Sequence, residues 1–281
     1  MPPCAGLRAH VELSRISGYI VCETFKIAPR NYRPGYSTVN VDKALRMLED
    51  WKLQLPSELG IGEGADPAVI SLHLASNQLI VLTTRPILLA AVKQAVAERY
   101  MNGQWSVQQH AHGRYIQACT EAAHCNLILA QRLRCTRKLL QAGLHFVFNA
   151  GVILLLQRIL NYAGGDKKVN PTETTTPEID FAMCTFEDES RTGTNYPRDC
   201  FKVLQDLKAL VDRYLSRGHG AFEHGGYPGS VPSVPGPPFV AQQQGEVQGI
   251  ARNVIESNDL YQEMRMWIQS DGLHLHNSLL I

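Results

Sequence analysis

The sequence predicts an all-α fold, a large multi-helix domain that is interrupted by long polar loops. Apolar residues recur at steps of three and four along several long segments, which is the period of an amphipathic helix. No convincing run of alternating apolar and polar residues indicates a strand, and there is no internal repeat. With 281 residues, 44% of them apolar, the chain is long enough to bury an ample core.

The first two helices are expected near the N-terminus. Residues 7–25 place Leu13, Ile16 and Ile20 on one helical face. The second helix is expected to begin near Asn40, a residue type favoured at helix N-caps, and to end before Pro56. Its apolar stripe is Val41, Leu45, Leu48 and Trp51.

A third helix is expected to begin at Asp66-Pro67, an N-cap followed by proline at the first helical position. Its apolar stripe runs into Arg85-Pro86 and continues on the other side. Because Pro86 lacks an N–H and its ring crowds the carbonyl of Leu82, we expect the helix to kink or end there and to turn a corner into the next helix. The stripe is Leu72, Ala75, Leu79, Leu82, Pro86 and Leu89.

The next two helices are expected to form the middle of the domain. Ser106 and Gln109 have the spacing of a capping box before the fourth helix, whose stripe places Cys119 in the core. Residues 139–160 are the most apolar stretch, with no formal charge through Gln157, so a membrane span has to be considered. Its polar side chains would each need a partner in lipid, and we therefore expect a helix buried in a soluble domain. They are Gln141, His145, Asn149 and Gln157.

The C-terminal part is expected to contain a long loop, a helix, a linker and a last helix. Residues 163–195 are polar and are interpreted as a loop, with Phe181 and Phe186 as candidate contact residues among acidic ones. A helix over 197–216 completes a domain that spans residues 1–216. The Gly/Pro-rich residues 217–245 are predicted to be a flexible linker, and residues 246–281 a helix and tail that pack back on the domain.

The net charge argues against a nucleic-acid-binding domain with a basic face, and the cysteine spacing argues against one that is built around zinc. Lys+Arg number 27 against 26 Asp+Glu, a net charge of +1, so we expect neither a strongly basic face nor direct DNA binding by these residues. The seven cysteines are widely spaced and contain no C-x-x-C, which argues against zinc fingers and zinc ribbons. They are expected to be free thiols.

Motifs for catalysis and cofactor binding were sought and not found. The sequence has no D-D-x-x-D for magnesium diphosphate chemistry, no P-loop and no G-x-G-x-x-G. Two histidine pairs, His110 with His112 and His274 with His276, could touch a metal, but we interpret them as surface histidines. The sequence therefore predicts no catalytic, cofactor-binding or metal-binding residue, no cofactor, and a protein that is not an enzyme.

Four segments in order resemble the fungal-specific transcription factor domain, the helical middle homology region of zinc binuclear cluster regulators. The likeness covers about residues 10–270 and is carried by residues 45–59, 72–89, 119–128 and 146–156. In that family a Trp-x-x-x-Leu-Pro stretch precedes a helix ending in Arg-Pro. The matching residues here are Trp51, Leu55, Pro56, Arg85 and Pro86.

The resemblance implies a nuclear transcription regulator that acts on a gene set such as a metabolic pathway or a biosynthetic gene cluster. Its expected partners are the transcription machinery or another regulator, with a small-molecule effector and a homodimer as further options, and no membrane. The five motif residues would be structural, with Arg85 satisfying carbonyls that Pro86 frees.

The chain departs from the family because it lacks the six-cysteine cluster, so it resembles only the regulatory half. We therefore expect zinc, and contact with DNA, only through a missing domain or a partner. Two alternatives remain open: a helical scaffold or interaction protein without a role in transcription, and a helical enzyme whose site the sequence does not reveal.

Overall fold

The computed structural model describes residues 3–24, 38–100, 106–107, 110–136, 139–163, 176–191 and 195–216. This part of the chain is 89% helical, with seven α-helices and no strand, which confirms the predicted all-α fold class. The predicted linker at 217–245 and the predicted helix and tail at 246–281 lie outside the described residues.

The helices follow the chain in an order close to the predicted one. Two short helical turns accompany them, the π-helical turn η1 (Ile20–Thr24) and the 3-10 turn η2 (Ser57–Leu59). The α-helices are α1 (Pro3–Tyr19), α2 (Thr38–Leu53), α3 (Pro67–Tyr100), α4 (Gly113–Thr136), α5 (Gln141–Ala163), α6 (Pro177–Ser190) and α7 (Asn195–Ser216).

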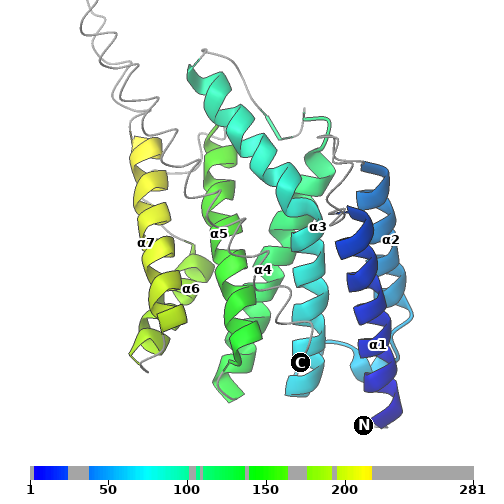
Figure 1. Cartoon of the computed structure of the whole chain (residues 1–281). Helices are drawn as coiled ribbons and strands as arrows, with labels where there is room; N and C mark the ends of the chain where they lie inside the picture. Colours follow the sequence, from blue (N-terminus) through cyan, green and yellow to red (C-terminus); the bar gives the residue numbers. More distant parts are fainter. Residues whose placement is uncertain are drawn as a thin grey trace, which may run out of the picture.

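The helices stand side by side, with α1 and α2 at one edge of the structure and α6 and α7 at the other (Figure 1). Between these edges lie α3, α4 and α5. The central position of α5 agrees with its sequence, because a helix that is apolar on all sides needs neighbours all round. Its residues Ile153, Leu155 and Leu156 are fully buried.

Two hydrophobic cores hold the helices together, and α3 belongs to both. The larger core joins α3, α4, α5, α6 and α7 and includes Leu74 and Leu88 of α3. The smaller core joins α1, α2 and η2 to the other side of α3, where Leu72, Leu79 and Leu82 lie. A residue's place on the circumference of α3 therefore decides which core it packs into.

The sequence predicted that the third helix would either kink or end at Pro86. The helix does not end there. α3 is continuous over its 34 residues with Pro86 inside it, and its ribbon changes direction part of the way along (Figure 1). The hydroxyls of Thr83 and Thr84 donate to the carbonyls of Leu79 and Ile80, each at 2.7 Å. Such bonds from Ser or Thr to the preceding turn commonly accompany a bend, so the corner lies within one helix.

Two helix starts differ from those that the capping residues predicted. α2 begins at Thr38, and the Asn40 side chain donates to the carbonyl of Glu23 in η1 at 2.9 Å instead of capping its own helix. α4 begins at Gly113, seven residues after Ser106, so Ser106 does not cap it. The Asn40 side chain therefore has a partner other than the helix end that its position suggested.

The prediction of a loop over 163–195 was wrong, because α6 occupies Pro177–Ser190. Proline stands at its first position and Glu178 and Asp180 in its first turn, both of which favour a helix start. Phe186 is fully buried and meets the Phe148 ring edge-on, with 6.2 Å between ring centroids. Phe186 is therefore a core residue and not a free contact residue, and Phe181 also packs against the core.

Two helices, α3 and α5, are long and apolar enough to cross a membrane by length and composition alone. The most apolar window of each is 72% buried inside the structure, which is the burial expected of core helices. The expectation that the chain has no membrane partner rests on this burial and on the polar residues of α5.

The central position of α5 leads to a prediction about stability. Leu155→Ala should lower the free energy of unfolding by about 2–5 kcal/mol, because it removes a fully buried side chain and leaves a cavity. Leu53→Ala is the control, since Leu53 is 78% exposed at the end of α2 and should change little. Urea unfolding followed by circular dichroism measures both, and equal effects would show that α5 is not the core helix.

Candidate functional site

A cavity of about 320 Å³ lies where α1, α3 and the N-terminal end of α5 meet. This volume falls within the range of roughly 300–1,000 Å³ that is usual for small-molecule sites. α3 stands between α1 and α5 in Figure 1 and contributes the largest share of the wall. The lining is mainly leucine, alanine and phenylalanine, with a few serine, histidine and glutamine side chains.

Two helical faces build most of the cavity wall. His10, Leu13, Ser14 and Ser17 follow at steps of three, one and three on α1, which places them on one side of that helix. Six residues of α3 share one face in the same way. They are Ser71, Leu74, Ala75, Gln78, Leu79 and Leu82. Leu133 of α4 and the residues around the start of α5 complete the lining.

The cavity lies at the boundary between the two hydrophobic cores. Leu13, Leu79 and Leu82 belong to the smaller core, whereas Leu74 and Leu133 belong to the larger one. Protein interiors are usually close-packed, so a cavity of this size marks a place where the two cores do not interdigitate.

A buried hydrogen bond fixes the α1 wall to the rest of the domain. The indole N–H of Trp51 donates to the carbonyl of Ala9 at 3.0 Å, and both residues are buried. Ala9 directly precedes His10, so this bond positions the cavity-lining turn of α1. Trp51 is one of the five residues that carry the resemblance noted in the sequence, and this contact is a structural one.

Gln78 is the unusual residue of the cavity. Its side chain is only 3% exposed, and neither its amide nitrogen nor its amide oxygen has a hydrogen-bond partner. Ser17 on α1 is 4% exposed, and its hydroxyl also lacks a partner. Ser14 and Ser71, in contrast, donate to carbonyls of their own helices, those of His10 and Pro67. A buried polar atom without a partner costs free energy, so Gln78 and Ser17 leave hydrogen-bonding atoms that a ligand or water in the cavity would satisfy.

A polar relay, which consists of Asn149, His145, Tyr196 and Cys200, leads from the cavity toward α7. The amide nitrogen of Asn149 lies 3.0 Å from Nε2 of His145, and Nδ1 of His145 lies 3.2 Å from the hydroxyl of Tyr196. Both ring nitrogens of His145 therefore have polar neighbours. The Tyr196 hydroxyl in turn contacts the thiol of Cys200.

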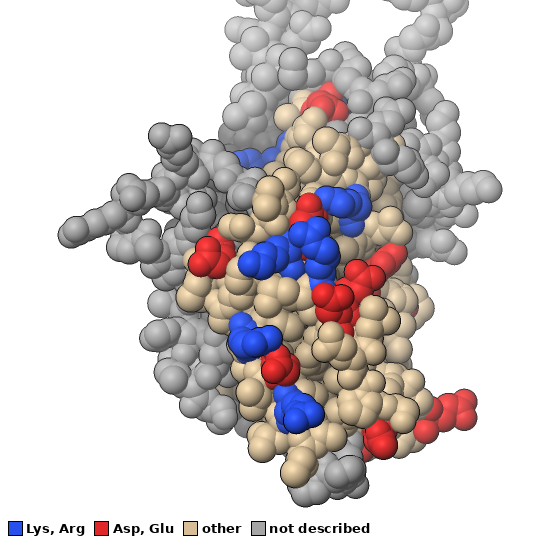
Figure 2. Space-filling model, turned by 90° about the vertical axis from the view of Figure 1, so that its right-hand side faces the viewer, with Lys and Arg blue, Asp and Glu red and all other residues tan. Residues whose placement is uncertain are grey.

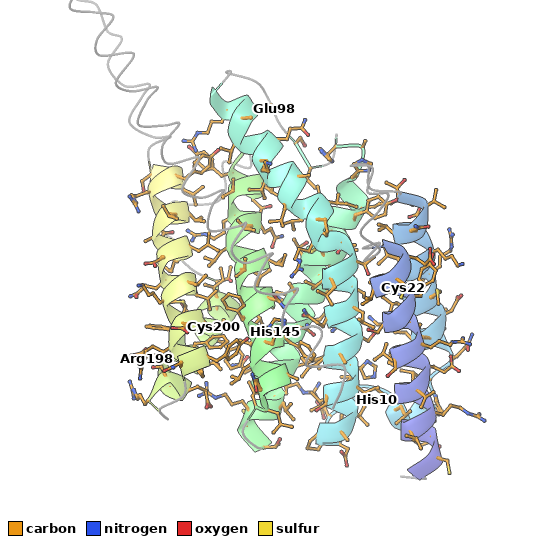
Figure 3. All side chains as sticks on the ribbon, in the orientation of Figure 1. His10, Cys22, Glu98, His145, Arg198 and Cys200 are labelled. Carbon is orange, nitrogen blue, oxygen red and sulfur yellow. The ribbon has the colours of Figure 1, made fainter. Side chains whose placement is uncertain are left out.

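Figure 3 shows how the ends of this relay lie. Cys200 is on the side of α7 toward α5 and His145, whereas Arg198 points outward from α7. His10 lies on α1, on the other side of α3. The relay and the α1 wall therefore approach the cavity from different sides.

The buried thiols are not poised to act as nucleophiles. Burial raises the pKa of Cys119 and the pKa of Cys200 to about 12, so both remain protonated at neutral pH. Burial likewise raises the pKa of the Tyr196 hydroxyl. The other five cysteines are exposed free thiols.

The cavity wall and the face on which α1 and α2 lie both lack a concentrated charge. No aspartate, glutamate, lysine or arginine lines the cavity. Figure 2 shows the face on which α1 and α2 lie, where basic and acidic side chains are interspersed instead of gathered by sign. Among the described residues, no group of three or more histidine, cysteine or acidic side chains is arranged to hold a metal ion. His274 and His276 lie outside the described part of the chain.

None of the five motif residues lines the cavity, but three of them have a visible structural role. Trp51 holds α1, Leu55 packs against the smaller core, and Pro86 lies within the bent helix α3. Pro56 is exposed and precedes the η2 turn. Arg85 is 4% exposed, and its charge acts on the Cys119 thiol; its expected contact with freed carbonyls stays a prediction.

The sequence did not identify Gln78, Ser17 or His145 as site residues. A signal for Gln78 was present, because it follows Ala75 by three residues and precedes Leu82 by four on the apolar stripe. A polar residue at such a position is either paired within the core or faces a ligand. Sequence alone does not show which of these applies.

Comparisons with known proteins add no assignment to this geometry. No family model matches the chain, and neither a curated protein nor a solved structure matches it significantly.

The unpaired amide of Gln78 yields a prediction about stability. Gln78→Met should raise the free energy of unfolding of the isolated chain by about 1–3 kcal/mol, because it removes buried polar atoms while keeping a side chain of similar length. Gln117→Met on the exposed face of α4 is the matched control and should change stability by a few tenths of a kcal/mol, about the value of its helix-surface bond to Glu121. Destabilisation of the Gln78 variant would mean that its amide is hydrogen-bonded in the folded protein.

The buried thiols yield a second prediction. At pH 7.5, iodoacetamide should label Cys125 and Cys184 rapidly and should label Cys119 and Cys200 only after unfolding. The reason is that the buried thiols are both inaccessible and held protonated by their raised pKa. Mass spectrometry of native and urea-unfolded samples measures the difference, and fast native labelling of Cys119 would contradict the packing of α3 against α4.

Proposed function

We propose that this chain is a regulatory domain of a fungal transcription regulator, and that it holds a small effector in the cavity between α1, α3 and α5. The observation that carries the effector-binding part is the cavity itself, with unpaired Gln78 and Ser17 in a mainly apolar wall. The order of the four sequence segments and the Trp51, Leu55, Pro56, Arg85, Pro86 motif support the role in transcription.

Regulation would proceed through protein contacts and not through chemistry on the effector. Among the described residues, the cavity holds neither an acid–base pair nor a reactive thiol. An effector that fills the space between the two cores would stabilise one position of α1 and α2 relative to α3. A ligand shifts such an equilibrium by as much as its affinities for the two positions differ.

A reporter assay in a fungal host tests the regulatory role. The full chain is fused to an unrelated DNA-binding domain whose site controls the reporter gene. We expect reporter expression to differ from that of the DNA-binding domain alone, because the chain would contact the transcription machinery. The Leu155→Asp variant should lose this effect, since an unpaired charge in the centre of α5 disrupts the fold.

Two results would contradict the regulatory role. One is reporter expression equal to that of the DNA-binding domain alone under every growth condition tested. The other is an unchanged transcriptome after deletion of the gene in a fungus that expresses it. Either result would favour the helical scaffold as the better interpretation.

Direct DNA binding is a separate prediction. The purified chain should not bind duplex DNA with nanomolar affinity, because its net charge is only +1 and basic and acidic side chains are interspersed on the face that Figure 2 shows. Fluorescence anisotropy with a labelled random-sequence duplex, at low and physiological salt, measures it. Tight binding that weakens steeply with salt would show that the chain contacts DNA itself.

A further inference from the structure

The unpaired atoms of Gln78 specify what kind of chemical group the cavity can recognise. The carboxamide side chain has an acceptor oxygen and a donor nitrogen, and both are buried without partners. A ligand group that offers only an acceptor or only a donor would satisfy one atom and leave the other unpaired. A group that presents a donor and an acceptor side by side would satisfy both.

Ser17 adds a second polar contact from another helix. Ser17 lines the same cavity from α1, and its hydroxyl is buried without a partner. A hydroxyl both donates and accepts, so it can adapt to whichever atom of the ligand faces it. Polar recognition from α1 and α3 together would orient a ligand within the otherwise apolar space.

The electrical character of the cavity favours a neutral ligand. No acidic side chain, lysine or arginine lines it. Two histidines line the cavity, of which His10 is exposed and His145 contacts the Asn149 amide. A charged ligand group at Gln78 would be buried without a counterion, which is strongly unfavourable.

The rest of the wall favours an apolar body. Leu13, Leu79, Leu82 and Leu133 are all less than 9% exposed and line the cavity around Gln78 and Ser17. Burial of hydrocarbon against these side chains would supply most of the affinity, roughly in proportion to the apolar area removed from water.

We propose that the cavity binds a neutral, mainly apolar molecule whose polar group is a carboxamide or a cyclic amide, paired with both side-chain atoms of Gln78 and assisted by Ser17. This inference rests on the proposed function and deepens it, because it names the chemical class of the effector. The binding event itself is a property of the purified chain.

Three matched probes test the proposal by titration calorimetry on the full chain at pH 7. Octanamide has the apolar body and both hydrogen-bonding atoms. N,N-dimethyloctanamide keeps the acceptor and lacks the donor, and octanoate has the same chain with a negative charge. We expect octanamide to bind at least about tenfold more tightly than either of the others, because only octanamide satisfies both atoms of Gln78 without burying a charge.

Variants assign this selectivity to the cavity. Gln78→Met should remove the preference for octanamide, whereas Gln117→Met, on the exposed face of α4, should retain it. Ser17→Ala should weaken octanamide binding by several-fold, as expected for the loss of one hydrogen bond. Circular dichroism establishes that each variant is folded.

Several results would overturn the proposal. They are no binding of any probe, equal binding of all three, or a preference for octanamide that survives Gln78→Met. The reporter assay separates this failure from failure of the proposed function. A chain that regulates the reporter but does not select octanamide refutes only the ligand class, and one that selects octanamide but never changes the reporter refutes only the role in transcription.

Discussion

The structure depends on the packing of α3 on more than one side at once. A helix that is apolar around most of its circumference must be covered all round, and a single neighbouring layer cannot do this. The larger core covers the side with Leu74 and Leu88, and α1 and α2 cover the side with Leu72 and Leu79. The bend within α3 lets one continuous helix take part in both cores.

The cavity follows from this shared packing. Two cores that meet along one helix have different shapes, and their meeting place is where close packing is hardest to achieve. Trp51 holds α1 close enough to enclose the space but does not fill it. Gln78 lies at this meeting place with both amide atoms unpaired, although an apolar residue there would be more stable. Stability that is given up at the wall of a cavity is typical of a functional site.

Periodicity in the sequence predicted most of the fold, because the apolar stripe of a helix such as α4 marks the side of that helix that is buried. It failed at α6, where a short apolar stripe among acidic residues was interpreted as a loop. The helix starts predicted at Asn40 and Ser106 were also wrong, because Asn40 donates to the carbonyl of Glu23 and α4 begins seven residues after Ser106. The site could not be predicted, because it depends on which faces of distant helices meet. Gln78 and Ser17 are 61 positions apart, and only tertiary packing shows that both line one cavity.

A crystal structure of the full chain, at a resolution that shows ordered water, is the most direct test of this account. The account predicts an open cavity between α1, α3 and α5, with the Gln78 amide turned into it and bonded only to water or to a bound small molecule. A space filled by neighbouring leucine and phenylalanine side chains, with Gln78 hydrogen-bonded to the protein, would contradict it.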